Sequence, residues 1–138
     1  MKKEIEMKWQ GGMAFNTMLD GHSVTVDAPA EVGGNDSGPR PKALMLVALG
    51  GCTGMDVVSI LKKMRVEVED FTMRISGNLT EEHPKHFDSM KLIYEFKGKD
   101  LSEEKIHKAI KLSMEQYCGV SAVYKKALDF EYEVVIKE

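Results

Sequence analysis

The sequence predicts an α+β fold, because segments that suit strands and segments that suit helices fall into separate groups along its 138 residues. Two observations support this class. Apolar and polar residues alternate with a period of two in several short segments, as in sheets with one covered face. A long and almost entirely apolar segment in the middle of the chain suits a buried helix. The expected order is a strand meander, the long helix, two strands, an interrupted helix and a last strand.

The N-terminal segment is expected to form a meander of short strands, at 3–9, 14–19 and 23–27. Gly11-Gly12 marks the first turn, and Asp20-Gly21 is a strong signal for a tight hairpin. Segment 29–41, rich in proline and glycine, predicts a loop. Nothing before this loop is long enough for a separate domain, so we expect one domain over residues 1–138.

Segment 41–64 predicts the long helix, with Pro41 in the first turn, where its missing N–H is tolerated. Its first part, 43–54, is apolar on every side, and such a helix is normally buried on every side. A single small chain offers too little surface for that, so we expect a partner surface. Gly50, Gly51 and Gly54 each cost roughly 1 kcal/mol relative to alanine. We therefore expect another backbone to approach the helix closely there.

The second half of the chain predicts strands at 66–79 and 90–96 and a last strand at 130–136. Between them lies a helix for which Asp100 or Ser102 is the expected N-cap. Gly119 is expected to break this helix, which then resumes over 120–127.

Composition excludes several classes of protein. The net charge of −3 lacks the basic surplus of a nucleic-acid-binding module. Residues 1–10 have no apolar region of the kind found in a signal peptide, and the uncharged run 43–55 is too short to span a bilayer. We therefore expect a cytoplasmic protein with reduced cysteines, with neither nucleic acid nor membrane as a partner.

Cys52 and Cys118 are the residues whose side chains are most suited to carry out chemistry. Neither belongs to a CxxC motif, so the sequence predicts no thioredoxin site and no zinc knuckle, and we expect no metal and no cofactor. The break at Gly119 places Cys118 beside the start of a helix, which is expected to lower its pKa below the usual value of about 8.5. The alternative for both cysteines is that they are small, packed apolar residues.

Three motifs together resemble the OsmC/Ohr family, and its OsmC-like branch in particular. They are Gly-Pro-Arg-Pro at 38–41, Gly-Gly-Cys-Thr-Gly at 50–54 and Tyr-Cys-Gly-Val-Ser-Ala-Val at 117–123. The resemblance implies an intertwined homodimer in which antiparallel sheets wrap two central cysteine-bearing helices. It also implies a thiol peroxidase that reduces organic hydroperoxides, with hydrogen peroxide as a further candidate substrate, in defence against oxidative stress.

The resemblance assigns a role to each cysteine. Cys52 matches the peroxidatic cysteine, whose oxidation by peroxide gives a sulfenic acid. Cys118 matches the resolving cysteine, which condenses with that sulfenic acid to a disulfide. The Cα atoms must then lie about 4.4–6.8 Å apart. An external dithiol would reduce the disulfide, so the implied partners are a second copy of the chain, a small peroxide and this reductant.

The chain departs from the family pattern at two positions. Active peroxidases of the family use an arginine that follows a Gly-Gly pair in the N-terminal meander, but here Met13 follows it. They also use a glutamate shortly after the loop proline, where this chain has Lys42 and then alanine. Arg40 and Lys42 are the candidate replacement cations, and Glu31 is the candidate carboxylate.

These departures keep two other functions open. One is a redox sensor or small-molecule-binding protein of the same family without peroxidase activity, which the missing arginine and glutamate favour. The other is a structural or interaction protein in which both cysteines only pack.

Overall fold

The computed structural model describes all residues from Met1 to Glu138 and confirms the α+β class. The chain forms two compact units, Met1–Met45 and Leu46–Glu138. The prediction of one domain over 1–138 stays a prediction.

The first unit is built on an antiparallel meander of β1 (Lys8–Trp9), β2 (Phe15–Leu19) and β3 (His22–Val26). The β2–β3 hairpin turns at Asp20 and Gly21, whose φ angles of 52° and 81° fit the expected tight turn. Two 3₁₀ turns follow, η1 (Ala30–Val32) and η2 (Pro41–Ala43).

The first predicted strand, 3–9, is mostly wrong, because only Lys8 and Trp9 pair with β2. Four of the seven residues before them are charged, and exposed ion pairs join Lys2 to Glu4 at 3.3 Å and Glu6 to Lys8 at 3.6 Å. Such side chains gain little from burial against a sheet.

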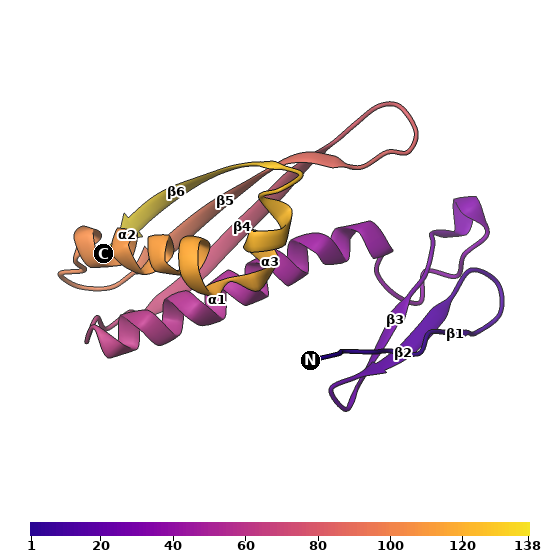
Figure 1. Cartoon of the computed structure of the whole chain (residues 1–138), viewed down its shortest axis with the longest axis horizontal. Helices are drawn as coiled ribbons and strands as arrows, with labels where there is room; N and C mark the ends of the chain where they lie inside the picture. Colours follow the sequence, from indigo (N-terminus) through magenta and orange to yellow (C-terminus); the bar gives the residue numbers. More distant parts are fainter. The chain divides into compact units, whose positions relative to one another are not determined.

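The second unit packs helices on one face of a three-stranded sheet, ordered β4 (Asp70–Leu79), β5 (Phe87–Lys97), β6 (Asp129–Lys137). β4 and β5 are antiparallel, whereas β5 and β6 are parallel. The parallel pair requires a crossover, and α2 (Glu103–Leu112), a π-turn η3 (Ser113–Tyr117) and α3 (Gly119–Tyr124) provide it. Figure 1 shows α1 (Leu44–Lys63) and α2 lying along this sheet.

Ser102 is the N-cap of α2, as one of the two predicted candidates, and its hydroxyl accepts a hydrogen bond from the backbone N–H of Lys105 at 3.2 Å. The strand predicted from residue 66 instead begins at Asp70. The backbone N–H of Val66 is already used, because it bonds the Leu61 carbonyl at 2.9 Å and closes the end of α1.

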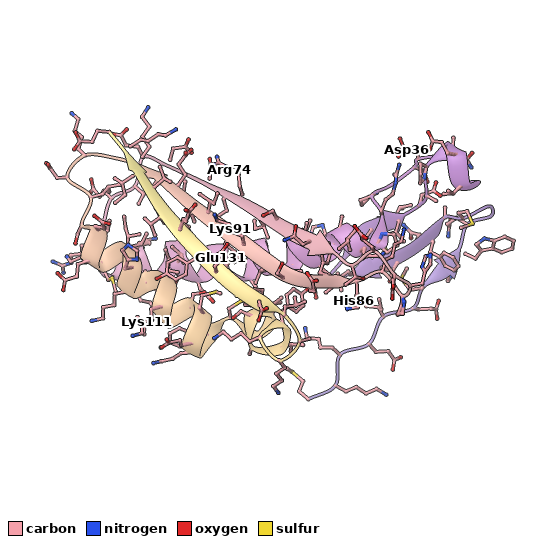
Figure 2. All side chains as sticks on the ribbon, turned by 90° about the horizontal axis from the view of Figure 1, so that it is seen from above. Asp36, Arg74, His86, Lys91, Lys111 and Glu131 are labelled. Atoms are coloured by element: carbon pink, nitrogen blue, oxygen red, sulfur yellow. The ribbon has the colours of Figure 1, made fainter.

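One face of the sheet is covered and the other is open. Leu92, Tyr94 and Phe96 alternate along β5 and are fully buried. Side chains of opposite parity point away from the helices, and Arg74 and Lys91 mark this open face in Figure 2. The alternation predicted for this strand is therefore confirmed.

Within one chain, α1 is buried on one side only. Its other side carries a row of exposed residues, which we call the α1 stripe: Val47, Gly51, Met55 and Val58. Val47, Met55 and Val58 are 65%, 76% and 55% exposed. The expected burial of this helix on every side thus requires a surface from outside the second unit, and it stays a prediction.

The close approach predicted at the helix glycines involves side chains and not another backbone. A Cβ on Gly50 would lie 2.8 Å from Ile75 Cδ1, and one on Gly54 would lie 2.6 Å from Met73 Cε. Both neighbours belong to β4, so the absence of a Cβ at these glycines lets α1 pack closely against the sheet of the same unit. A Cβ on Gly51 would meet nothing within 4 Å.

Segment Pro41–Lys63 has a mean hydropathy of 1.9 over its most apolar stretch, and by length and composition alone it could cross a membrane. The prediction that this segment is too short to span a bilayer was based on the uncharged run 43–55 alone, and the helix is longer than that run. The core helix of a soluble protein has the same length and composition, and α1 packs Gly50 and Gly54 against β4 as such a helix does.

Candidate functional site

The second unit brings the two cysteines together. Cys52 lies in the middle of α1, and Cys118 lies between η3 and α3. Their sulfur atoms and a carboxylate oxygen of Asp56 all lie within 4.8 Å of one another. Both thiols are free. Cys52 is partly exposed, whereas Cys118 is buried with 3% of its surface accessible.

Local backbone geometry places Cys118. Its N–H bonds the carbonyl of Ser113 at 2.7 Å, which closes the π-turn at the end of α2. Cys118 itself is extended, with φ −78° and ψ 101°, and acts as the N-cap of α3. Its sulfur accepts a hydrogen bond from the backbone N–H of Ser121 at 3.3 Å. The predicted position of Cys118 beside a helix start is confirmed.

The prediction that this position lowers the pKa of Cys118 is wrong. Burial raises the pKa of the Cys118 thiol, because a buried thiolate loses its hydration. The Ser121 N–H acts in the opposite direction but does not cancel the effect of burial, and the neighbouring Cys52 sulfur adds to the rise. Desolvation therefore affects the pKa of Cys118 more than the start of the short helix α3 does.

A chain of buried hydroxyl groups fixes α1 beside this pair. Thr53 Oγ1 lies 2.8 Å from the Tyr94 hydroxyl and 2.9 Å from Ser113 Oγ. Ser113 donates in turn to Asp56 Oδ2 at 2.9 Å. Because the Ser113 proton goes to Asp56, Thr53 must donate to Ser113 and Tyr94 must donate to Thr53. Burial raises the pKa of Tyr94 to about 12, so it remains a donor.

Sequence reasoning missed Asp56, Thr53, Tyr94 and Ser113 as parts of the site. A signal existed only for Asp56, which follows Cys52 by one helical turn and so shares its side of α1. Tyr94 and Ser113 lie on β5 and in η3, and only the fold brings them to Thr53.

The other predicted site residues lie in the first unit, whereas both cysteines lie in the second. The Arg40 guanidinium pairs with the Asp36 carboxylate and donates to the Gly38 carbonyl at 3.0 Å. Lys42 and Glu31 are exposed in η2 and η1. The second unit therefore brings together Cys52 and Cys118, and the roles of the three charged residues of the first unit stay predictions.

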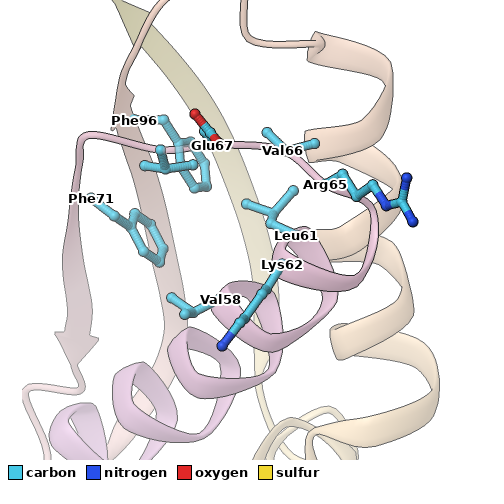
Figure 3. Close-up of a pocket in the computed structure, with 9 residues that line it drawn as sticks. Val58, Leu61, Lys62, Arg65, Val66, Glu67, Phe71 and Phe96 are labelled. Carbon is cyan, nitrogen blue, oxygen red and sulfur yellow. The ribbon is translucent and has the colours of Figure 1, made fainter.

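An apolar pocket of about 460 Å³ lies at the C-terminal end of α1, where α1 faces β4 and β5 (Figure 3). Its walls are mainly aliphatic and aromatic, and charged side chains line it as well. The lining residues are Val58, Leu61, Lys62, Arg65, Val66, Glu67, Val68, Phe71 and Phe96.

Comparison with known proteins extends over the whole chain. Residues 33–133 match the family model described as OsmC-like protein. Protein YhfA of Escherichia coli K12 is 34% identical over 135 residues, which cover 96% of this chain and 98% of that protein.

Solved structures are also similar to this chain over nearly all of its length. A hypothetical protein from Aquifex aeolicus VF5 has a TM-score of 0.84 at 33% identity, with 100% of this chain and 99% of that chain covered. The organic hydroperoxide resistance protein OhrB of Bacillus subtilis has a TM-score of 0.65 at 19% identity, with 96% and 98% covered. The second likeness shows a shared fold alone. The OsmC/Ohr-like α+β fold expected from the three motifs is confirmed for one chain. The expectation of antiparallel sheets is wrong for β5 and β6, which pair in parallel because a helical crossover joins them. The intertwined homodimer stays a prediction.

Proposed function

Because the chain belongs to the OsmC-like protein family, we propose that it is a cysteine-based thiol peroxidase that reduces organic hydroperoxides. One observation carries the proposal. The Cys52 and Cys118 sulfurs lie within 4.8 Å of each other, although their residues come from different helical segments. A disulfide between these free thiols would require their sulfurs to approach to about 2.0 Å.

The burial of the two thiols supports the assignment of their roles. Cys52 is the more exposed, so a peroxide would reach its sulfur first. Attack of this sulfur on the peroxide breaks the O–O bond, and the alcohol leaves with a proton while Cys52 becomes a sulfenic acid. Attack by Cys118 on the sulfenic sulfur then releases water and forms the disulfide. A small external dithiol supplies the two electrons that return both cysteines to thiols.

We further propose that the active protein is a cytoplasmic homodimer. The exposed α1 stripe is an apolar surface of the kind that a monomer in water normally covers. The first unit adds exposed apolar side chains, with Trp9 at 66% and Met18 at 60% accessible, and it has too few residues to bury them itself.

A turnover assay tests the peroxidase. The reduced wild-type protein should consume cumene hydroperoxide, with dithiothreitol as reductant, much faster than dithiothreitol alone. Hydrogen peroxide should be assayed in parallel to compare the substrates. Cys52→Ser should abolish turnover while leaving the far-ultraviolet circular dichroism unchanged. Wild-type turnover at the rate of free thiol would refute the proposal.

The pocket of Figure 3 favours one second candidate, a small-molecule-binding protein without peroxidase activity. Its volume of about 460 Å³ suits a ligand of modest size, and its apolar walls suit an apolar one. Native mass spectrometry should then detect a co-purified ligand that is lost in Val66→Trp and retained in the control Leu79→Trp, an exposed position outside the pocket. Ligand-free wild-type protein would count against this function.

A further inference from the structure

The cluster of Cys52, Asp56 and Cys118 has the composition of a metal site. Two of its members come from successive turns of α1 and the third from the start of α3, and their ligand atoms lie within 4.8 Å of one another. We propose that the reduced protein binds one zinc ion between the two sulfurs and the Asp56 carboxylate.

The donor atoms select the metal. Thiolates favour zinc over magnesium and calcium, and a carboxylate beside them favours zinc over copper(I). Zinc bonds sulfur at about 2.3 Å and carboxylate oxygen at about 2.0–2.2 Å, so the donor atoms of a tetrahedral site lie about 3.5–3.8 Å apart. The three ligand atoms lie within 4.8 Å of one another, so binding would require them to approach by up to about 1 Å, mainly through rotation of the partly exposed Cys52 and Asp56 side chains. Three protein ligands leave the fourth position open to water.

Groups around the cluster already orient its ligands. The Ser113 hydroxyl donates to Asp56 Oδ2 at 2.9 Å, and the Ser121 N–H donates to the Cys118 sulfur at 3.3 Å. Hydrogen bonds of this kind fix the orientation of the ligands of metal sites. The second oxygen of Asp56 remains free for a metal.

The acidic member of the cluster is unpaired, although Lys63 and Lys108 line the same cavity as Asp56. Among residues Leu46–Glu138, the Asp56 carboxylate forms no ion pair with any lysine, arginine or histidine. A divalent cation at the cluster would supply the opposite charge that this carboxylate lacks within the second unit.

Zinc would regulate the thiols without any redox step. Binding displaces one proton from each thiol, and no atom is oxidised or reduced. The bound thiols are withdrawn from reaction with peroxide, so zinc would act as a reversible inhibitor of the peroxidase. The binding itself does not depend on the proposed function, because a reduced chain without peroxidase activity would still hold the metal.

Zinc binding is measured on the full-length, metal-free, reduced protein without oxygen. Competition with a chromophoric chelator should give one zinc per chain with release of protons, and cobalt(II) should give the near-ultraviolet charge-transfer absorption of thiolate ligands. Asp56→Asn should weaken zinc binding by about 10- to 100-fold, the loss typical for a disturbed metal site. The matched control Asp88→Asn, at an exposed position of β5, should bind as wild type does.

Two results would overturn the site. One is equal zinc binding by wild type and by the Cys52→Ser, Cys118→Ser double variant. The other is a cobalt spectrum of wild-type protein without thiolate absorption, which needs no variant and so does not depend on how any variant folds. Peroxide turnover is measured separately on metal-free protein, so the failure of either proposal is distinguishable from that of the other.

Discussion

At the scale of single residues, Thr53 occupies the key position in the buried polar chain. It is fully buried and links the Tyr94 hydroxyl of β5 to the Ser113 hydroxyl of η3. Loss of its hydroxyl would leave the buried Tyr94 hydroxyl without its hydrogen-bond acceptor. A buried donor without a partner costs the full desolvation of that group.

We therefore expect Thr53→Val to lower the free energy of unfolding by about 1–3 kcal/mol. Adding Tyr94→Phe removes the orphaned hydroxyl, so the double variant should be less destabilised than the sum of the single ones. Urea denaturation measures both effects. The control is Thr72→Val, an exposed threonine on β4, and equal losses for Thr53→Val and Thr72→Val would contradict the account.

Asp27 organises the loop of the first unit in a similar way. Its carboxylate accepts from the Ser37 hydroxyl at 2.7 Å and from the backbone N–H groups of Ser37, Ala28 and Asn35. The bonds from Ser37, followed by the one from Ala28, lower the pKa of Asp27 from 3.8 to about 2.

Because the folded-state pKa is the lower one, the ionised carboxylate stabilises the fold above about pH 4, and this stability is lost as the pH falls toward 2. Fluorescence of Trp9, the single tryptophan, reports on this unit during acid titration. Asp27→Asn should be less stable at neutral pH and should lose this part of the acid dependence. The exposed Asp20→Asn should keep it, and an unchanged profile for Asp27→Asn would exclude the role.

At the scale of elements, the break between α2 and α3 does not come from Gly119. The helix ends in the π-turn of η3 and at the extended residue Cys118, whereas Gly119 begins α3 without a positive φ. A Cβ on Gly119 would meet nothing within 4 Å. The sequence predicted the place of the break correctly and assigned it to the wrong residue, because a π-turn has no simple sequence signal.

We expect Gly119→Ala to keep or raise stability, by up to about 1 kcal/mol, because alanine loses less backbone entropy in a helix. Thermal or urea unfolding checks this. Gly21→Ala serves as the contrasting variant, since its φ of 81° is strained for alanine and the substitution should destabilise. Destabilisation by Gly119→Ala comparable to that by Gly21→Ala would show that the break depends on glycine after all.

Some features of these elements were predictable from the sequence, and others were not. Strands with a strict period of two, such as β5, and the capped start of α2 were predicted, because their signals are local. The cysteine pair was predicted through the family motifs. Tyr94 and Ser113 were not recognised, because their meeting with Thr53 depends on long-range packing, whereas the local signal for Asp56, one helical turn after Cys52, was overlooked. The lower pKa expected for Cys118 failed because burial is a property of the folded chain.

At the scale of the whole molecule, the α1 stripe is the surface that a second copy would cover. Met55 is its most exposed member, at 76%. A charge buried in an apolar interface is costly unless it is paired. Met55→Glu should therefore shift the protein from dimer to monomer.

Analytical ultracentrifugation over a range of concentrations measures this shift. Leu79→Glu makes the same kind of change at an exposed position of β4 outside the stripe and should remain dimeric. Two results would show that the α1 stripe is not a dimer interface. One is a wild-type protein that is monomeric at every concentration, and the other is a Met55→Glu variant that is as dimeric as wild type.

The central claim is that Cys52 and Cys118 act as one redox pair, and their oxidation by a single equivalent of peroxide tests it most directly. Reduced, metal-free protein is treated with cumene hydroperoxide and analysed by intact mass and peptide mapping after thiol blocking. We predict one intrachain disulfide joining Cys52 to Cys118, with Cys118→Ser trapping a sulfenic acid on Cys52 instead. Two free thiols after treatment, or oxidation of Cys52 in wild type without a link to Cys118, would contradict the account.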